Sequence, residues 1–162
     1  MTLEFIVKDQ RWAVLLEEAQ DTLTDLYLTL LSDHNINQEN VEISVMLTDD
    51  AEIQDLNHRY RNKDQATDVL SFQQYEDIDT IQAALSLHKI SLGDIILSYD
   101  TLVKNAESQK KSHGNHFIHL FVHGMLHLLG YDHEHNEEAH EMEQCEIKLL
   151  AGYGISDPYR IG

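Results

Sequence analysis

The segment HGMLHLLGYDHEH, from His123 to His135, places four histidines among leucines. His123 and His127 are four residues apart, which puts their side chains on one face of a helix, about 6 Å apart along its axis. Two imidazole nitrogens so placed can bind one metal ion, as the two histidines of H-E-x-x-H zinc sites do. Because one pair at this spacing often arises by chance, the residues that follow decide the prediction.

A glycine and a third histidine follow this pair. Gly130 is the residue type that ends a helix by entering a left-handed conformation, so we expect the chain to turn back there. His133 then follows the turn, and the spacing H-x3-H-x5-H leaves a fourth coordination position open, as in catalytic zinc sites. His135 competes for the same role but is less well placed after the turn. We therefore predict one Zn²⁺ ion bound by His123, His127 and His133, although three histidines also suit nickel, copper or iron.

Position 124 separates this segment from the zinc peptidases. A peptidase with the H-E-x-x-H motif uses its Glu as general base on the zinc-bound water, but this chain has Gly124 at that position. Glycine costs about 1 kcal/mol relative to alanine inside a helix, so we expect Gly124 to allow a close approach of backbone or substrate. His116 and His119 share the histidine stripe and are expected to be wall or surface residues, with His119 also placed to support a ligand.

Composition and charge limit the class of protein. The chain has 162 residues, the size of one domain, and we expect residues 1–162 to form a single globular unit. Its one cysteine, Cys145, cannot form an internal disulfide, and we find neither a secretion signal nor an apolar run of the about 18–20 residues that span a membrane. We therefore expect a cytoplasmic protein without membrane association. The formal net charge of −18 repels nucleic acid at long range, so RNA binding needs a local basic patch or a metal.

The elements that position the histidines form a mixed pattern of strands and helices. The order of apolar and polar residues predicts strands at 3–7, 41–47, 69–72 and 93–98, and helices at 12–31, 99–111, 113–129 and 137–150. A capping signal at Thr48 or Asp49, supported by Glu52, predicts a further helix at 48–59. We expect residues 76–90 to be a loop or hairpin. Because the order shows no regular βαβ alternation, it predicts a single-domain α+β fold with a mixed sheet of about four strands packed against about five helices, one of them a zincin-like histidine helix.

Three sequence blocks together resemble the YbeY family. HGMLHLLGYDH, from His123, is similar to the family's H-G-x-L-H-L-x-G-Y-D-H, and LNHRYRNKDQATDVLSF, from Leu56, is similar to L-N-x-x-Y-R-x-K-D-x-P-T-D-V-L-S-F. LGDIILS, from Leu92, resembles L-G-D-I-x-I-S. The blocks occur in the family's order and cover the middle and the C-terminal part of the chain. Ala66 and Gln73 stand where the family commonly has proline, which concerns the rigidity of that loop more than the chemistry.

The resemblance implies a bacterial rRNA maturation factor with metal-dependent endoribonuclease activity on single-stranded RNA. It links that activity to 3′-end processing of the small-subunit rRNA and to ribosome quality control, so rRNA and the ribosome are the implied partners. It also implies zinc ligands at His123, His127 and His133 and an important arginine in the Y-R pair, which here is Arg61. From the charge alone, we expect the acidic surface to suit a basic ribosomal protein or a ribosome-associated GTPase.

A mechanism follows as a hypothesis. Three neutral histidines leave the charge of the ion at the site, where it lowers the pKa of bound water toward about 7 and polarises a phosphoryl oxygen. Arg61 is the candidate that binds the phosphate oxygens, and Arg59 and Lys63 are either a local basic patch or a solvated helix end. Asp132 is a candidate to accept a proton or to orient a ligand, and the second role is favoured.

Two alternatives stay open. One is a metal-dependent hydrolase of another class, such as a peptidase, against which the missing glutamate at position 124 argues. The other is a ribosome assembly factor whose metal is structural. The open fourth position argues against a structural metal, but weakly, because His135 or Asp132 could complete the coordination.

Overall fold

The computed structural model describes residues 3–132 and 136–159. Its strands are β1 (Leu3–Val7), β2 (Val41–Thr48), β3 (Val69–Gln73) and β4 (Ile90–Ser98), and its helices are α1 (Trp12–Asp33), α2 (Asp50–Arg61), α3 (Ile78–Leu85), α4 (Tyr99–Ser108), α5 (His113–Leu128) and α6 (Asn136–Ala151), with one 3-10 turn at Gln38–Asn40. The predicted α+β class is confirmed. None of the helices in the described part of the chain is long and apolar enough to cross a membrane.

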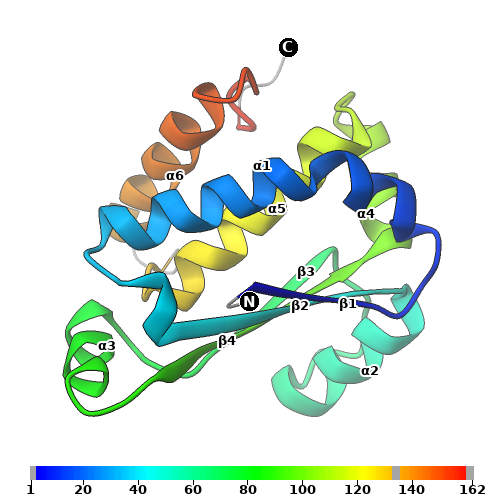
Figure 1. The fold of residues 1–162 in the computed structure, drawn as a ribbon. Helices are drawn as coiled ribbons and strands as arrows, with labels where there is room; N and C mark the ends of the chain where they lie inside the picture. The colour runs from blue at the N-terminus through cyan, green and yellow to red at the C-terminus, as the bar shows by residue number, and fades with distance from the viewer. Residues whose placement is uncertain (1–2, 133–135, 160–162) are drawn as a thin grey trace.

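The four strands form one mixed sheet in the order β1-β2-β4-β3. β1, β2 and β4 are parallel to one another, and β3 runs antiparallel to β4 at the edge of the sheet. Every second residue of β2, from Val41 to Leu47, is buried, which is the pattern of a strand with one face against a core. Helices α1 and α5 lie on one side of the sheet, and α2 lies on the other (Figure 1).

Helix α5 runs through the centre of the core. It packs against α1, α4, α6, β3 and β4, and most of its side chains are buried. A Cβ atom at Gly124 would lie 3.0 Å from the Cγ2 atom of Ile95 on β4, so a larger residue would require the Ile95 side chain to shift by a few tenths of an ångström. Gly124 thus permits a close approach, as expected, but the approaching group is a core side chain rather than backbone or substrate.

The expectation of a loop or hairpin at residues 76–90 is wrong, because α3 occupies most of the segment. Asp77 begins the helix: its Oδ1 atom accepts a hydrogen bond of 2.8 Å from the backbone N–H of Thr80. Ile81 is fully buried and fixes α3 against the core. Ile78, Ile81 and Leu85 follow helical spacing, but eight residues carry only two turns of that pattern and the polar start hides it.

Candidate metal centre

Capped ends fix helix α5 and therefore the histidines along it. Ser112 begins it, with Oγ accepting a hydrogen bond of 3.1 Å from the backbone N–H of Asn115. At the other end Gly130 has a φ of 100°, and its N–H donates to the carbonyl of His127. The N–H of Tyr131 donates to the carbonyl of Leu126, which completes a Schellman motif. The predicted left-handed turn at Gly130 is confirmed.

His123 and His127 bring two ring nitrogens together. Their Nε2 atoms are 3.1 Å apart. The Nδ1 atom of His127 is 3.1 Å from the carbonyl oxygen of Tyr131, and Nδ1 of His123 is 2.7 Å from Oε1 of Glu146. Since both partners are acceptors, each Nδ1 carries the proton, and in a neutral ring Nε2 is then the acceptor. Two acceptor nitrogens this close need a proton or cation between them, and neighbouring ligands of a tetrahedral zinc ion are about 3.3 Å apart.

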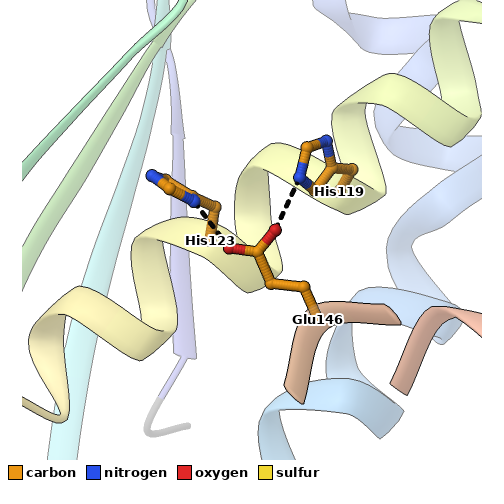
Figure 2. Close-up of side chains that lie close together, drawn as sticks. All are labelled: His119, His123 and Glu146. Carbon is orange, nitrogen blue, oxygen red and sulfur yellow. Dashed lines mark hydrogen bonds and ion pairs between the residues drawn. The ribbon is translucent and has the colours of Figure 1, made fainter. Parts of the chain in front are cut away.

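Glu146 on α6 contacts the His123 ring on the side opposite its Nε2 atom. The carboxylate is fully buried and accepts three hydrogen bonds: 2.7 Å from His123 Nδ1, 2.8 Å from His119 Nε2 and 2.6 Å from the hydroxyl of Tyr159. Figure 2 shows both histidines reaching from α5 toward the two oxygens of this one carboxylate. Such a carboxylate fixes the tautomer and the orientation of a metal-binding imidazole.

The charges in this cluster follow from its hydrogen bonds. Burial alone would raise the pKa of Glu146, but the bonds from His119, His123 and Tyr159 outweigh it and lower the pKa to about 2. Burial also lowers the pKa of His119, so this ring stays neutral beside an ionised carboxylate. For Tyr159, burial and the neighbouring carboxylate raise the pKa, which keeps the phenol protonated as a donor.

The structure also offers a second possible metal site, on the other side of the His123 ring. His119, His123 and Glu146 form a cluster with ligand atoms within 4.8 Å of one another, which could hold an ion. However, separations of 2.7 and 2.8 Å are those of N–H donors on a carboxylate, and each ring nitrogen would have to lose its proton to bind a metal. The geometry therefore favours Glu146 as support for His123, with the ion at the Nε2 atoms of His123 and His127.

The third predicted ligand, His133, and its competitor His135 lie outside the described residues, so these two predictions stay open. The chain comes back toward α5 just before them, as the contact of the Tyr131 carbonyl with His127 demonstrates. Asp132 is half-buried and lines a cavity of about 330 Å³ at the C-terminal end of α5. Its predicted role in orienting a ligand also stays a prediction.

Arg61 lies at the end of α2, beside the edge strand. One of its guanidinium nitrogens, Nη2, donates a hydrogen bond of 2.6 Å to the carbonyl of Ser71 on β3, and its Cζ atom is 5.2 Å from the centre of the Phe72 ring. Ser71 pairs with Ile95 on β4, the residue on which Gly124 packs between the two histidines. The sheet thus places the Arg61 guanidinium on the strand that borders the ligand helix.

The basic patch predicted around Arg61 is exposed. Arg59 forms a surface ion pair with Asp55, with Nε and Oδ2 3.1 Å apart, which is the arrangement of a solvated helix face. Lys63 is exposed as well. Both cations are therefore accessible to a polyanion, and neither is buried in the core.

Two residues of the cluster, Glu146 and Tyr159, were not predicted. Glu146 carries a signal in the sequence, because it lies four residues after Met142 and four before Leu150, both of which are buried. A carboxylate on the apolar stripe of a helix needs a buried donor. Tyr159 lies beyond the last helix, where periodicity gives no information. His119 and His123 donate to the same carboxylate, so the predicted support of a ligand by His119 would act only through Glu146.

Comparisons with known proteins show which family the chain is similar to. The family model described as Endoribonuclease YbeY matches residues 6–154. The endoribonuclease YbeY of Paramagnetospirillum magneticum is 50% identical over 119 residues, which are 74% of this chain and 71% of that protein. The endoribonuclease YbeY of Azorhizobium caulinodans is 38% identical over 161 residues, which are 99% of this chain and 98% of that protein.

The fold is also shared with a solved structure. The solution structure of TM1509 from Thermotoga maritima has a TM-score of 0.57 to this chain at 22% sequence identity, and the match covers 98% of this chain and 99% of that one. This likeness concerns the fold alone. The sequence matches extend over nearly the whole chain, including both histidines of the candidate centre, and the chain belongs to the YbeY family of endoribonucleases.

Proposed function

We propose that this protein is a zinc-dependent endoribonuclease that cleaves single-stranded segments of rRNA, including the 3′ end of the small-subunit rRNA, and acts in ribosome quality control. The observation that carries the metal dependence is the 3.1 Å separation of the Nε2 atoms of His123 and His127. Family membership supports the cleavage of RNA. The proposal assigns His133 as third ligand, on the spacing of the motif.

Each residue then has a defined part in the reaction. A zinc ion at this centre would supply an activated water and a positive charge for the phosphoryl oxygens. Glu146 and the Tyr131 carbonyl hold the rings of His123 and His127 in the tautomer that leaves Nε2 to the ion. Arg61 binds non-bridging phosphate oxygens through the donors that Ser71 does not use, and its stacking on Phe72 restricts the guanidinium.

A peptidase is the less favoured alternative for two reasons. A glutamate cannot replace Gly124 without displacing Ile95, because even a Cβ atom would approach it to 3.0 Å. An extended peptide would bind by pairing with the edge strand β3, but Arg61 already occupies the carbonyl of Ser71 there. The first contact argues against a glutamate general base on the helix, and the second argues against a peptide strand at this edge of the sheet.

The cellular setting belongs to the same proposal. An rRNA substrate places the protein in the cytoplasm with the ribosome. The net charge of −18 suits a basic ribosomal protein or a ribosome-associated GTPase as a further partner, because such a surface attracts positive charge at long range.

One cleavage assay tests the proposal. The full chain is incubated with an rRNA fragment and, separately, with casein, with and without a chelator, alongside the variants His127→Ala and Arg61→Ala. His140→Ala, which changes an exposed histidine on α6, is the matched control. We expect RNA cleavage to be lost with the chelator and in His127→Ala, reduced in Arg61→Ala and unchanged in the control.

Other outcomes separate the alternatives. RNA cleavage that survives both the chelator and His127→Ala would contradict a metal-dependent nuclease. Casein cleavage that disappears with the chelator would favour the peptidase, and a tightly bound metal without any cleavage would favour an assembly factor with a structural metal. Elemental analysis of the purified protein identifies the ion.

A further inference from the structure

An exposed aromatic pair lies next to Arg61. Tyr60, on the last turn of α2, is 64% exposed, and its ring meets the half-buried ring of Phe72 edge to face, with centroids 5.6 Å apart and planes at 70°. A ring this open to water is not stabilised by burial in the hydrophobic core. The two rings form a small aromatic surface at the edge of the sheet.

Cations surround this aromatic surface. The Cζ atom of Arg59 is 5.5 Å from the centre of the Tyr60 ring, and that of Arg61 is 5.2 Å from the centre of the Phe72 ring. With Lys63, three of the chain's 11 lysines and arginines fall within five residues, although the chain has a net charge of −18. Since the protein as a whole repels polyanions, a phosphate backbone is best accepted at a local concentration of cations such as this one.

The two sides of strand β3 connect this surface to the metal centre. Side chains alternate along a strand, so Ser71, which pairs with Ile95, points to the α5 side, and Phe72 points to the α2 side. Arg61 contacts residues that face the two sides of the strand, because it stacks on the Phe72 ring and donates a hydrogen bond to the carbonyl of Ser71. An RNA strand with a phosphate at Arg61 therefore has its reacting part on one side of the edge strand and its flanking nucleotide on the other.

We propose that Tyr60 and Phe72, flanked by Arg59 and Arg61, bind one unpaired base of the RNA by stacking, outside the metal centre. The inference rests on the proposed function, and it adds a reason for selecting single strands, because a base within a duplex has no free face to offer. Stacking of a base on an aromatic side chain is tolerant of sequence and changes affinity by about 5- to 150-fold. The site thus selects unpaired RNA without reading its sequence.

Binding measurements on the intact, metal-loaded protein test this. The probes are a fluorescent 2′-O-methyl RNA single strand, its hairpin counterpart and an abasic strand of the same length and charge, each checked for integrity after the titration. The variants are Tyr60→Ala, Tyr60→Leu and Tyr60→Phe, with Tyr153→Ala as control because Tyr153 is another partly exposed tyrosine, just after the end of α6. Unfolding curves confirm that each variant is folded.

We expect Tyr60→Ala and Tyr60→Leu to weaken binding of the single strand by about 5- to 150-fold, and Tyr60→Phe and the control to keep it. Binding of the abasic strand should stay the same in all variants. Equal losses for the single strand and the abasic strand, or no loss at all, would overturn the stacking site. If RNA cleavage in the earlier assay persists while the stacking effect is absent, only this inference fails. If the wild-type protein neither binds nor cleaves RNA, both fail.

Discussion

Glu146 is the residue that most constrains the candidate centre. Three donors, from His119, His123 and Tyr159, converge on a carboxylate that is fully buried. Only a side chain with two acceptor oxygens can accept all three hydrogen bonds. Only an ionised carboxylate also keeps the proton of the His123 ring on Nδ1. A glutamine in its place would turn an N–H₂ group toward one of these donors.

Glu146→Gln should therefore weaken metal binding while leaving the helices in place. We expect the affinity for Zn²⁺ to fall by about 10- to 100-fold, the effect usual for losing the hydrogen-bond partner of a metal-binding histidine. Competition with a chromophoric chelator measures it. Glu143→Gln on the same helix is the control, and an equal loss of affinity in both variants would contradict the role given to Glu146.

The sequence predicted the residues whose relation is local and missed those whose relation is not. His123, His127 and Gly130 lie within one helix and its end, where geometry follows from spacing alone. Glu146 reaches His123 only because α6 packs on α5, across 23 residues of chain, and periodicity says nothing about which helices meet. The buried acid on an apolar stripe indicated a partner, but not its identity.

Among the elements, the turn after α5 carries the tightest constraint. Gly130 combines a φ of 100° with a backbone contact, since a Cβ atom there would lie 2.7 Å from Cα of Asp77. The same turn delivers the Tyr131 carbonyl to His127. It therefore links the end of α5, the start of α3 and the tautomer of His127, a proposed metal ligand.

Gly130→Ala should lower both the stability and the metal affinity. We expect about 1–3 kcal/mol less free energy of unfolding, the usual cost of a side chain in this conformation, increased by the clash with Asp77. Gly114→Ala, at the other end of α5, is the control, because a Cβ atom there meets nothing within 4 Å. That change should be neutral or stabilising by up to about 1 kcal/mol. Urea unfolding measures the free energy of unfolding of both variants. An equal loss in Gly130→Ala and Gly114→Ala would contradict the requirement for glycine at position 130.

Short elements marked the limit of the fold prediction. The longer helices were found because they have ten or more residues, enough for their pattern to span nearly three turns or more, and the strands because short runs of apolar and β-branched residues mark them. Helix α3 was missed because it has eight residues, and its clearest signal is the cap at Asp77 rather than periodicity. The order β1-β2-β4-β3, with an antiparallel edge strand beside α5, could not be derived from local patterns.

At the scale of the whole molecule, Asp68 joins several elements. Its backbone carbonyl accepts from Ser98 on β4, and its Oδ2 atom accepts a bond of 2.9 Å from Asn105 on α4 and lies 3.5 Å from Nε2 of His116 on α5. Burial would raise the pKa of Asp68, but the contacts with His116 and Asn105 outweigh it and lower the pKa. The ionised form therefore stabilises the junction.

This junction predicts a pH dependence of stability. Because the folded-state pKa is lowered, the contribution of Asp68 is fully present above the unfolded-state value of about 3.9 and is lost as the pH falls through the folded-state value. Asp68→Asn should cost about 1–3 kcal/mol at pH 7, and the difference from wild type should shrink in acid. Urea unfolding of metal-free protein between pH 7 and pH 3 measures it. For the exposed control Asp21→Asn, we expect the difference in free energy of unfolding from wild type to show no such decrease in acid. A difference for Asp68→Asn that stays constant with pH would refute the stabilising role of ionised Asp68.

The charge distribution predicts a shallow salt dependence of RNA binding. Three cations near the edge strand, Arg59, Arg61 and Lys63, give a slope of log K against log salt of about −2, because each phosphate contact on a single strand contributes about −0.7. Arg61→Ala should reduce the slope by about 0.7. Fluorescence titrations at several salt concentrations test this, and a slope near −5 would mean that a larger basic surface binds the RNA.

The position of α5 at the centre of the core has a consequence for hydrogen exchange. Binding and catalytic residues are found disproportionately on loops, but here two proposed ligands lie on the most enclosed helix of the described chain. Amide protons along α5 should therefore exchange with deuterium only through global unfolding, with or without metal. Because an ion that binds only the folded state raises the free energy of global unfolding, mass spectra should show slower exchange along the whole of α5 with metal than without it, and not only at the turn after Leu128.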